Sequence, residues 1–252
     1  MVKQITSVNN SYIKELLTLK DKKDRILKKS FIVEGYHLVE EALKHRLLDS
    51  VLSTDKEVLE CIDVVNKYLV SDAVIKKLST TKTPQNIIGV VKNNINSSFD
   101  ALLAKSDLKV IILDNVNDPG NLGTIIRTSA ALGYDAVIAS IETVDFYNEK
   151  VLRATQGAIF KIPLVKGDLV QLINTLKSHE VYIYGTSLKS SKSITDVAKQ
   201  LKYGIIVGNE AQGVRDEVLA MCDQNIILPM EKDVESLNVG VAAAILMWEL
   251  KK

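Results

Sequence analysis

The sequence of 252 residues predicts an α/β protein in which a small unit precedes a larger one. Three observations support this fold class. Short apolar runs alternate with amphipathic segments through most of the chain, as strands alternate with helices in α/β folds. A polar stretch at residues 93–98 interrupts the alternation. Beyond it, apolar runs end in small or polar loops, which is typical of strands whose carboxyl ends carry a ligand site.

The first half reads as a small α/β domain. Its predicted helices have apolar residues at helical spacing, and its predicted strands are short apolar runs. We expect helices at Asn9 to Leu19, Gly35 to His45 and Asp72 to Leu78, with Ser71 or Asp72 as cap of the last. We expect strands at Ser30 to Glu34, around Val51, at Tyr68 to Val70 and at Ile87 to Lys92.

The second half begins with a predicted buried strand at Lys109 to Asp114, then turn residues up to Asn121. A helix over Leu122 to Leu132, ended by Gly133, and a strand over Asp135 to Ala139 complete a βαβ unit. The remaining predicted helices are Glu149 to Gln156 and Asp168 to Ser178, and the remaining predicted strands are Ala158 to Val165, Val181 to Tyr184, Gly204 to Val207 and Ile226 to Leu228.

The C-terminal stretch combines a strand, a charged loop and a long apolar helix. Ile226 to Leu228 stops at Pro229, and Ser236 is a good N-cap for a helix over Leu237 to Leu250. This helix has no polar face before Glu249, so we expect it to be covered on nearly all sides. With Ser236 and Asn238 at its start, the pattern fits either a ligand-gripping loop or an ordinary buried helix with a capping serine.

Composition narrows the class of protein. Hydrophobic residues make up 46% of the chain, enough for a full core, and no apolar run is long enough to span a membrane. We therefore expect a soluble, cytoplasmic protein. Cys61 and Cys222 offer no disulfide framework, and with three scattered histidines they have no zinc-ligand spacing, so no metal site is expected.

Charge is distributed unevenly along the chain. Residues 1–98 contain 16 Lys and Arg against 12 Asp and Glu, a net charge of +4, whereas the remainder carries −3. Lys20 to Lys29 places six cations within ten residues. This segment is either a solvated helix face or a surface that contacts the phosphates of a polyanion.

The glycine-containing loops lack the patterns of phosphate binding. Neither G-x-G-x-x-G nor G-x-x-x-x-G-K-[ST] is present, so a dinucleotide or nucleoside triphosphate is not supported. The ligand expected from these loops is a nucleoside without a phosphate chain, held by main-chain atoms.

Three segments together resemble the motifs of the SpoU/TrmH-like branch of the SPOUT RNA ribose 2′-O-methyltransferases. They are Asn121-x-Gly123-x-x-x-Arg127, Val207-Gly-Asn-Glu-x-x-Gly213, and Leu228-Pro229 through Ser236-Leu-Asn-Val239, in the family's order and spacing. Phe31-Ile-Val-Glu-Gly35 also resembles the family's N-terminal substrate-binding domain, which is like a small ribosomal α/β protein. The resemblance covers nearly the whole chain.

The resemblance implies a fold that composition and periodicity do not reveal. It implies an RNA substrate-binding domain at 1–95, a linker at 96–106 and a SPOUT methyltransferase domain at 107–252, whose parallel sheet contains a trefoil knot. S-adenosylmethionine would be bound in the knot by groups around Thr186, Gly208, Leu228 and Leu237. Members of this branch are homodimers, and the apolar C-terminal helix is a plausible interface. The two-domain layout favours rRNA of the 23S type over tRNA as substrate.

The resemblance also assigns roles to the motif residues. Arg127 is at the family's reaction centre, where it has been described as a general base. Because a guanidinium stays charged at ordinary pH, clamping a phosphate and stabilising the developing alkoxide is the more defensible role. Asn121 and Asn238 would hydrogen-bond the ribose or Arg127, Glu210 would orient Arg127 or Asn121, and Ser236 would order its loop.

Two functions remain open at this point. The first is an S-adenosylmethionine-dependent RNA 2′-O-ribose methyltransferase. The second is a non-catalytic RNA-binding or ribosome assembly factor on the same scaffold. Arg127, Glu210 and Asn238 favour the enzyme, because a scaffold without catalysis has no need of them.

Overall fold

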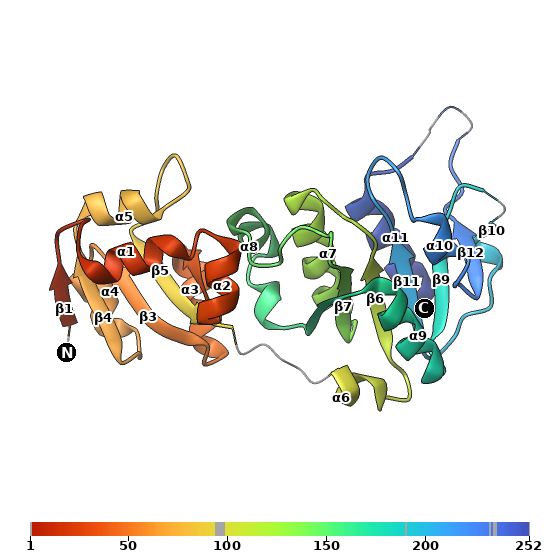
Figure 1. Cartoon of the computed structure of the whole chain (residues 1–252), viewed down its shortest axis with the longest axis horizontal. Coiled ribbons are helices and arrows are strands. Elements are labelled where there is room, and N and C mark those ends of the chain that lie inside the picture. Colours follow the sequence, from red (N-terminus) through yellow and green to blue (C-terminus); the bar gives the residue numbers. More distant parts are fainter. Residues whose placement is uncertain (1, 94–98, 190, 232, 234–235, 252) are drawn as a thin grey trace. The chain divides into compact units, whose positions relative to one another are not determined.

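The structure is a computed structural model that describes residues 2–93, 99–189, 191–231, 233 and 236–251. The chain separates into two compact units (Figure 1). Unit 1 contains residues 1–95 together with 147–160, and unit 2 contains 96–146 together with 161–252. The chain therefore passes from one unit to the other three times. Most of the polar break predicted at 93–98 lies outside the described residues.

Unit 1 is built on a mixed five-stranded sheet with the strand order β1-β4-β3-β5-β2. β4 pairs in parallel with β1 and β3, whereas β5 is antiparallel to β3 and β2. The strands are β1 (Val2–Ile5), β2 (Ser30–Glu34), β3 (Leu48–Ser53), β4 (Asn66–Val70) and β5 (Ile87–Lys92).

Helices cover both faces of this sheet. They bury β5, which is apolar on both sides. Ile88 and Val90 share an apolar cluster with α1 (Ser11–Thr18) and α5 (Asp72–Leu78). Gly89 lies between them and faces the opposite side of the sheet, since side-chain positions alternate along a strand. On that side the backbone of Gly89 packs close to Val39 of α3: a Cβ added to Gly89 would lie 3.1 Å from Val39 Cγ2. The remaining elements of unit 1 are α2 (Lys22–Lys28), α3 (Tyr36–Lys44), α4 (Lys56–Cys61), α8 (Glu149–Thr155) and the 3₁₀ helix η1 (Ala158–Phe160).

Unit 2 contains a seven-stranded sheet with the order β10-β12-β9-β11-β6-β7-β8. All its strand pairs are parallel, so the carboxyl ends of all strands lie at one edge. The strands are β6 (Lys109–Leu113), β7 (Ala136–Ser140), β8 (Leu164–Gly167), β9 (Tyr182–Thr186), β10 (Lys192–Ser193), β11 (Tyr203–Val207) and β12 (Gln224–Ile227).

The central strands of unit 2 are buried on both faces, as parallel sheets require. One face packs against an apolar cluster that includes Leu102, Ile173 and Val218. These residues belong to α6 (Phe99–Leu103), α9 (Leu169–Ser178) and α10 (Asp216–Leu219). The helices α7 (Pro119–Ala131) and α11 (Val239–Lys251) contact each other and the strands β7 and β11. Another 3₁₀ helix is η2 (Ile194–Asp196).

Buried polar contacts fix α11 against α7. The hydroxyl of Tyr134 donates to the carbonyl of Met247 (3.1 Å), and Ser129 Oγ lies 3.4 Å from Met247 Sδ. Ser129 also donates to the carbonyl of Ile125 (2.7 Å). These contacts hold the C-terminal half of α11, a helix whose start carries part of the site described below.

The parallel sheet and the preceding small α/β domain confirm the predicted fold class; the trefoil knot stays a prediction. The predicted strand at Ala158 to Val165 is wrong in its first half: Ala158–Phe160 is a 3₁₀ helix, and β8 starts only at Leu164. Pro163 separates the two, because it lacks the N–H that a ladder needs. The helix predicted from Leu122 starts at Pro119, since Asp118 caps it and proline suits a first turn.

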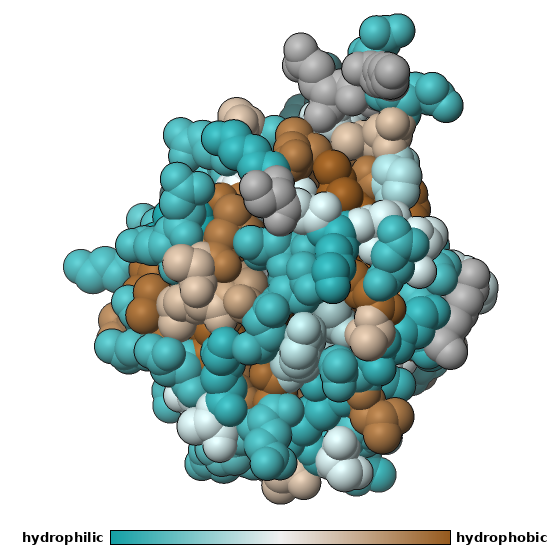
Figure 2. Space-filling view, turned by 90° about the vertical axis from the view of Figure 1, so that its right-hand side faces the viewer, coloured by the Kyte–Doolittle hydropathy of each residue, from teal (hydrophilic) through white to brown (hydrophobic). Residues whose placement is uncertain are grey.

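The C-terminal helix differs from the prediction in two respects. It begins at Val239 rather than Leu237. It is also covered on one side only: Val241, Ile245 and Trp248 are 48%, 43% and 55% exposed. Elsewhere, the end of unit 2 that faces the viewer in Figure 2 has hydrophobic residues in separate patches on a mostly hydrophilic surface. Within the described ranges, no helix has the length and hydropathy needed to cross a membrane.

Candidate active site

The candidate site is built from loops at the carboxyl edge of the unit 2 sheet. The loop after β6 leads into α7, the loop after β11 leads to α10, and the chain after β12 leads to α11. In open α/β sheets this edge is where ligands bind, because backbone groups and helix starts converge there. All three sequence motifs lie on these loops and on the helices that follow them.

Asn121 is fixed in the first turn of α7. Asp118 is the N-cap residue, and its carboxylate accepts from the backbone N–H of Asn121 (2.8 Å). Pro119 follows at the first helical position, where its missing N–H has no cost. The Asn121 side chain is thereby presented at the edge of the sheet.

Glu210 connects the loop after β11 to the start of α7. Its carboxylate accepts from the backbone N–H groups of Asn117 (3.2 Å) and Asp118 (3.0 Å). It also accepts from the side-chain amide of Asn121 (3.0 Å). Partial burial acts to raise the pKa of Glu210, but these hydrogen bonds outweigh it and lower the pKa below the ordinary value. Glu210 is therefore ionised at neutral pH, and it orients Asn121.

Asn238 joins the third motif to the first. Its side-chain amide donates to Oδ1 of Asn121 (2.8 Å). Its own Oδ1 accepts from the backbone N–H groups of Gly240 (3.0 Å) and Val241 (3.3 Å), so Asn238 is the N-cap of α11. The side chains of Glu210, Asn121 and Asn238 thus form one hydrogen-bonded chain across three loops, which we call the Glu–Asn–Asn chain.

Ser236 is not the cap that the sequence predicted. It is exposed, and it forms no hydrogen bond with any residue that the structure describes. The helix starts two residues later than predicted because the Asn238 side chain satisfies both the helix N–H groups and Asn121, which a serine hydroxyl could not do from position 236.

Arg127 lies two turns along α7 from Asn121. The side chain is exposed and has no hydrogen bond or ion pair with any of the described residues. Glu210, which the sequence expected to orient Arg127 or Asn121, binds Asn121. The guanidinium keeps its planar set of donors available for a ligand outside the protein.

The loop after β11 closes tightly on itself. The backbone groups of Asn209 and Gly213 exchange two hydrogen bonds (3.0 and 2.9 Å), and Gly213 has a φ of 73°. A Cβ on Gly208 would lie 2.1 Å from the carbonyl carbon of Gly213 and 2.2 Å from the nitrogen of Val214. Only glycine fits at position 208, because the backbone of the same loop occupies the space that a side chain would need.

Asn209 has a structural role that sequence reasoning missed. Its Oδ1 accepts from the N–H groups of Ala211 (2.9 Å) and Gln212 (3.1 Å), while its amide donates to the carbonyl of Asn115 (2.9 Å). An asparagine directly before a tight turn was the available signal, because its side chain readily bonds the backbone two residues on.

The ion pair between Asp114 and Arg215 was also missed. Asp114 is fully buried at the end of β6 and accepts from the backbone N–H (2.9 Å) and Nε (2.8 Å) of Arg215. It ties the loop after β6 to the loop after β11. A carboxylate ending an apolar strand was the signal, since a buried charge requires a partner.

The predicted cofactor residues occupy neighbouring strand ends. Thr186 ends β9, where its hydroxyl donates to the carbonyl of Ile206 (2.9 Å). Gly208 and Leu228 come directly after β11 and β12, both of which pair with β9. Leu237 precedes Asn238 and is 38% exposed. Backbone groups at these strand ends, with no side chain at position 208, fit the edge of a nucleoside, whose flat face Leu228 and Leu237 would cover.

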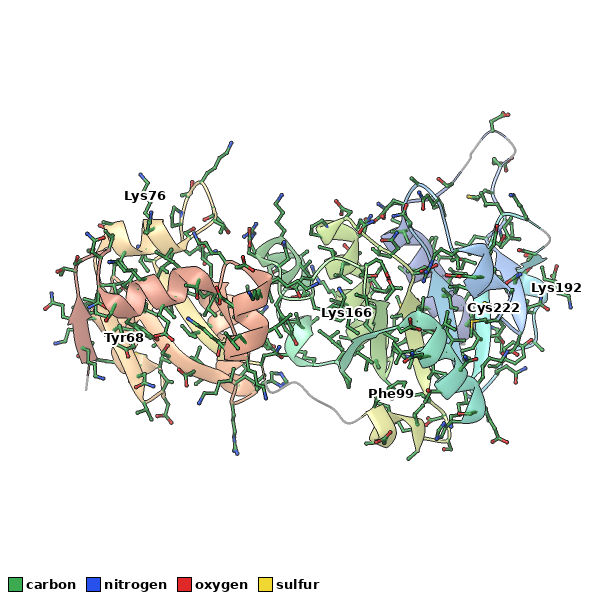
Figure 3. The ribbon with its side chains drawn as sticks, viewed as in Figure 1. Tyr68, Lys76, Phe99, Lys166, Lys192 and Cys222 are labelled. Atoms are coloured by element: carbon green, nitrogen blue, oxygen red, sulfur yellow. The ribbon has the colours of Figure 1, made fainter. Side chains whose placement is uncertain are left out.

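Cys222 comes before β12, at the opposite end of that strand from the site loops. Burial raises the pKa of Cys222 to about 12, and its thiol donates to the carbonyl of Val218 (3.3 Å). Cys222, labelled in Figure 3, is thus a structural residue. No group of three or more His, Cys, Asp or Glu side chains within the described ranges is arranged to hold a metal ion.

Known proteins resemble both halves of the chain. The SpoU rRNA Methylase family matches residues 109–248, and the MRM3-like substrate binding domain matches residues 10–89. A 23S rRNA (guanosine(2553)-2′-O)-methyltransferase, RlmP, of Bacillus subtilis (strain 168) is 38% identical over 99% of this chain and 100% of its own length.

Solved structures agree with these matches. The AdoMet-bound rRNA methyltransferase from Sinorhizobium meliloti has a TM-score of 0.87 and 28% identity, covering 99% of this chain and 97% of that one. The A. aeolicus TrmH/SpoU tRNA modifying enzyme has a TM-score of 0.53 and 29% identity, covering 60% of this chain and 77% of that one. The chain therefore belongs to the SpoU rRNA methylase family and is an S-adenosylmethionine-dependent RNA methyltransferase.

Proposed function

We propose that this protein methylates a ribose 2′-hydroxyl of 23S rRNA, with Arg127, Asn121, Glu210 and Asn238 forming the catalytic site. The observation that carries the proposal is the Glu–Asn–Asn chain. It holds three loops together at the carboxyl edge of the sheet, while Arg127 on the same helix α7 remains available to a substrate.

The choice of rRNA over tRNA rests on how much of the chain is matched. The Bacillus subtilis enzyme, named as acting on 23S rRNA, is matched over 99% of this chain. The tRNA-modifying enzyme from A. aeolicus covers 60%. The substrate-binding domain at residues 10–89 supports a large structured RNA, which needs contacts beyond the reaction site.

The cofactor would be held by Thr186, Gly208, Leu228 and Leu237. Backbone groups at the ends of β9, β11 and β12 would bind the edges of the nucleoside, and the leucine side chains would cover its apolar surface. When bound, S-adenosylmethionine supplies an electrophilic methyl group on a positively charged sulfur.

The protein's own residues would prepare the 2′-hydroxyl for attack. A ribose hydroxyl is a poor nucleophile and must lose its proton as its oxygen attacks. Arg127 would bind the adjacent phosphate with its planar fork and stabilise the negative charge that develops on the oxygen. A guanidinium does not give up its proton at ordinary pH, so the proton would leave to solvent.

Asn121, Glu210 and Asn238 would act as positioning residues. Both polar atoms of the Asn121 side chain are used, one by Glu210 and one by Asn238. This fixes the start of α7 relative to the start of α11, and so fixes the helix from which Arg127 projects. A preorganised charge stabilises a transition state more than a mobile one does. Ser236 would order the loop that precedes α11.

The protein would act as a homodimer through α11. Val241, Ile245 and Trp248 recur at intervals of four and three residues, so they form one stripe on the exposed side of the helix. Leu237, also partly exposed, precedes this stripe by four residues. Apolar stripes of this kind are typical of interfaces between protein chains.

Mapping of ribose methylation by mass spectrometry tests the proposed substrate. 23S rRNA and tRNA would be isolated from cells with and without the gene, and from the deleted strain carrying Arg127→Ala. We expect one 2′-O-methylated nucleotide in 23S rRNA to be lost on deletion and not restored by Arg127→Ala. A methylation lost from tRNA, with 23S rRNA unchanged, would contradict the proposal.

A further inference from the structure

Unit 1 contains a cavity of about 170 Å³ that none of the three motifs explains. Three segments border it: the start of α3, the loop that leads into β5, and the end of α8. The side chains that matter here are His37, Thr83, Gln85, Arg153 and Gln156. All of them belong to unit 1, although the last two come from the part of the chain that matches the methylase family.

The loop that leads into β5 is braced by Glu34, at the end of β2. The Glu34 carboxylate accepts from the hydroxyl of Thr81 (2.8 Å) and the backbone N–H of Gln85 (3.1 Å). Gln85 Oε1 accepts in turn from the N–H of Tyr36 (3.3 Å). Gly35 makes this approach possible: its φ is 102°, and a Cβ there would lie 2.6 Å from Gln85 Oε1. This wall of the cavity is therefore built before any ligand arrives.

The end of α8 is tied to the same cavity from the other side. His37 Nε2 donates to the carbonyl of Gln156 (3.0 Å), and Arg153 Nη1 donates to the hydroxyl of Thr80 (3.1 Å). The ring of Tyr147, just before α8, stacks on the ring of Phe31 in β2, with their centroids 4.6 Å apart. These contacts hold residues 147–160 on unit 1.

Several polar atoms of the lining remain without a partner among the described residues. Gln85 Nε2 and the Thr83 hydroxyl are donors, and Gln156 Oε1 is an acceptor. Because His37 Nε2 donates to a carbonyl, Nδ1 is the ring nitrogen left for a ligand. The charged side chains of the lining are already engaged, Glu34 by Thr81 and Arg153 by Thr80. The remaining neutral donors and acceptors match the edge of a nucleobase better than they match a phosphate group.

The cavity is small. Pockets for whole small molecules measure roughly 300–1,000 Å³, well above this one. Proteins that read RNA sequence take up single unstacked bases and bind their edges. Cations for the neighbouring phosphates are at hand, because Lys20 in the cation-rich segment donates to the carbonyls of Lys77 (3.1 Å) and Ser79 (3.4 Å), at the foot of the same loop.

We infer that this cavity binds one unpaired base of the RNA substrate and reads its identity through Gln85 and Gln156. The inference rests on the proposed RNA substrate but concerns a site in unit 1, whereas Arg127 lies in unit 2. The base bound here would be a recognition base, distinct from the nucleotide that is methylated.

Binding of short RNAs by the full chain tests this inference. The probes are four single-stranded heptamers of uridine with A, C, G or U at the centre, measured by fluorescence anisotropy at one salt concentration. We expect the wild type to prefer one central base about tenfold. Gln85→Ala and Gln156→Asn should reduce the preference below about twofold and leave the other three affinities unchanged.

Gln156→Asn is chosen because position 156 has a φ of 48°, which asparagine tolerates. Gln4→Ala, an exposed glutamine in β1 of the same unit, is the matched control and should behave as wild type. Equal binding of all four heptamers by the wild type, or an unchanged preference in both variants, would overturn the inference. Because no methyl transfer is measured, failure of the proposed 23S rRNA substrate would leave this result intact.

Discussion

The side-chain amide of Asn238 donates to Oδ1 of Asn121 across 2.8 Å, and this single bond joins the start of α11 to the start of α7. The residues are 117 positions apart in the chain. Because the Oδ1 atom of Asn238 also caps α11, the same side chain organises a helix and orients the site. Substitutions at Asn238 should therefore affect stability and activity together.

Asn238→Ala should lower the thermal midpoint, whereas Ser236→Ala should not. Loss of an N-cap costs about 1 kcal/mol, which corresponds to about 2–4 °C for a chain of this size. Ser236 forms no hydrogen bond with the residues that the structure describes, so we expect its hydroxyl to be expendable for stability. Differential scanning calorimetry of both variants checks this prediction. If Ser236→Ala lowered the thermal midpoint more than Asn238→Ala did, Ser236 and not Asn238 would be the N-cap of α11.

Glu210 should make the stability of the site loop depend on pH. Its pKa is lower in the folded protein, because hydrogen bonds from Asn121, Asp118 and Asn117 outweigh the opposing effect of partial burial. A carboxylate of this kind stabilises the folded state above its unfolded pKa, and the contribution is lost as pH falls through the folded pKa. Thermal midpoints of wild type and Glu210→Gln should differ at pH 7 and converge towards pH 3. A difference that grew on acidification would contradict this assignment.

Gly208→Ala should disrupt the loop after β11 even without a large side chain. The added Cβ would lie between 2.1 and 2.3 Å from backbone atoms of Gly213 and Val214, which cannot move aside cheaply. The motif resemblance alone pointed to a residue that lines the cofactor; the structure shows that the loop's own closure also requires glycine. Titration calorimetry with S-adenosylmethionine and a thermal scan should both show losses. Gly167→Ala is the control, because its Cβ would meet only the flexible Leu172 side chain, with a shortest distance of 3.2 Å.

Ile245→Glu should convert the proposed homodimer into a monomer. A charge in the middle of the exposed α11 stripe would have to be desolvated on association, which is costly without a partner. Light scattering at micromolar concentration gives the molar mass directly. Val170→Glu, a matched change at an apolar residue of α9 that is 36% exposed, should leave the mass unchanged. A wild-type protein that is monomeric in this experiment would refute the interface.

Much of the fold could be predicted because its central strands are continuous apolar runs. Residues 110–113 and 136–139 are buried on both faces, so their sequence shows no polar alternation and reads clearly as parallel strand. β1 was missed because it is an edge strand whose Lys3 and Gln4 are exposed, leaving no apolar pattern. β10 was missed for a simpler reason: two residues cannot form a periodic signal.

The membership of residues 147–160 in unit 1 could not be predicted from the sequence. It depends on the stacking of Tyr147 on Phe31, a contact between residues far apart in the chain. The consequence is practical. A fragment starting near Ser106, close to the predicted start of the methyltransferase domain, would leave this segment without its partner. The motifs located the site residues, but the pairing of Asn121 with Asn238 and of Asp114 with Arg215 became visible only in three dimensions.

The most direct test of the account is to measure methyl transfer and cofactor binding in Arg127 variants of the full chain. If Arg127 acts on the RNA side, Arg127→Ala should lower methyl transfer to 23S rRNA by about two to three orders of magnitude. Its affinity for S-adenosylmethionine should stay within a few-fold of wild type. Arg127→Lys should restore little, because lysine lacks the planar fork that binds a phosphate with two hydrogen bonds. Near-full activity in Arg127→Lys, or loss of cofactor binding in Arg127→Ala, would contradict the account.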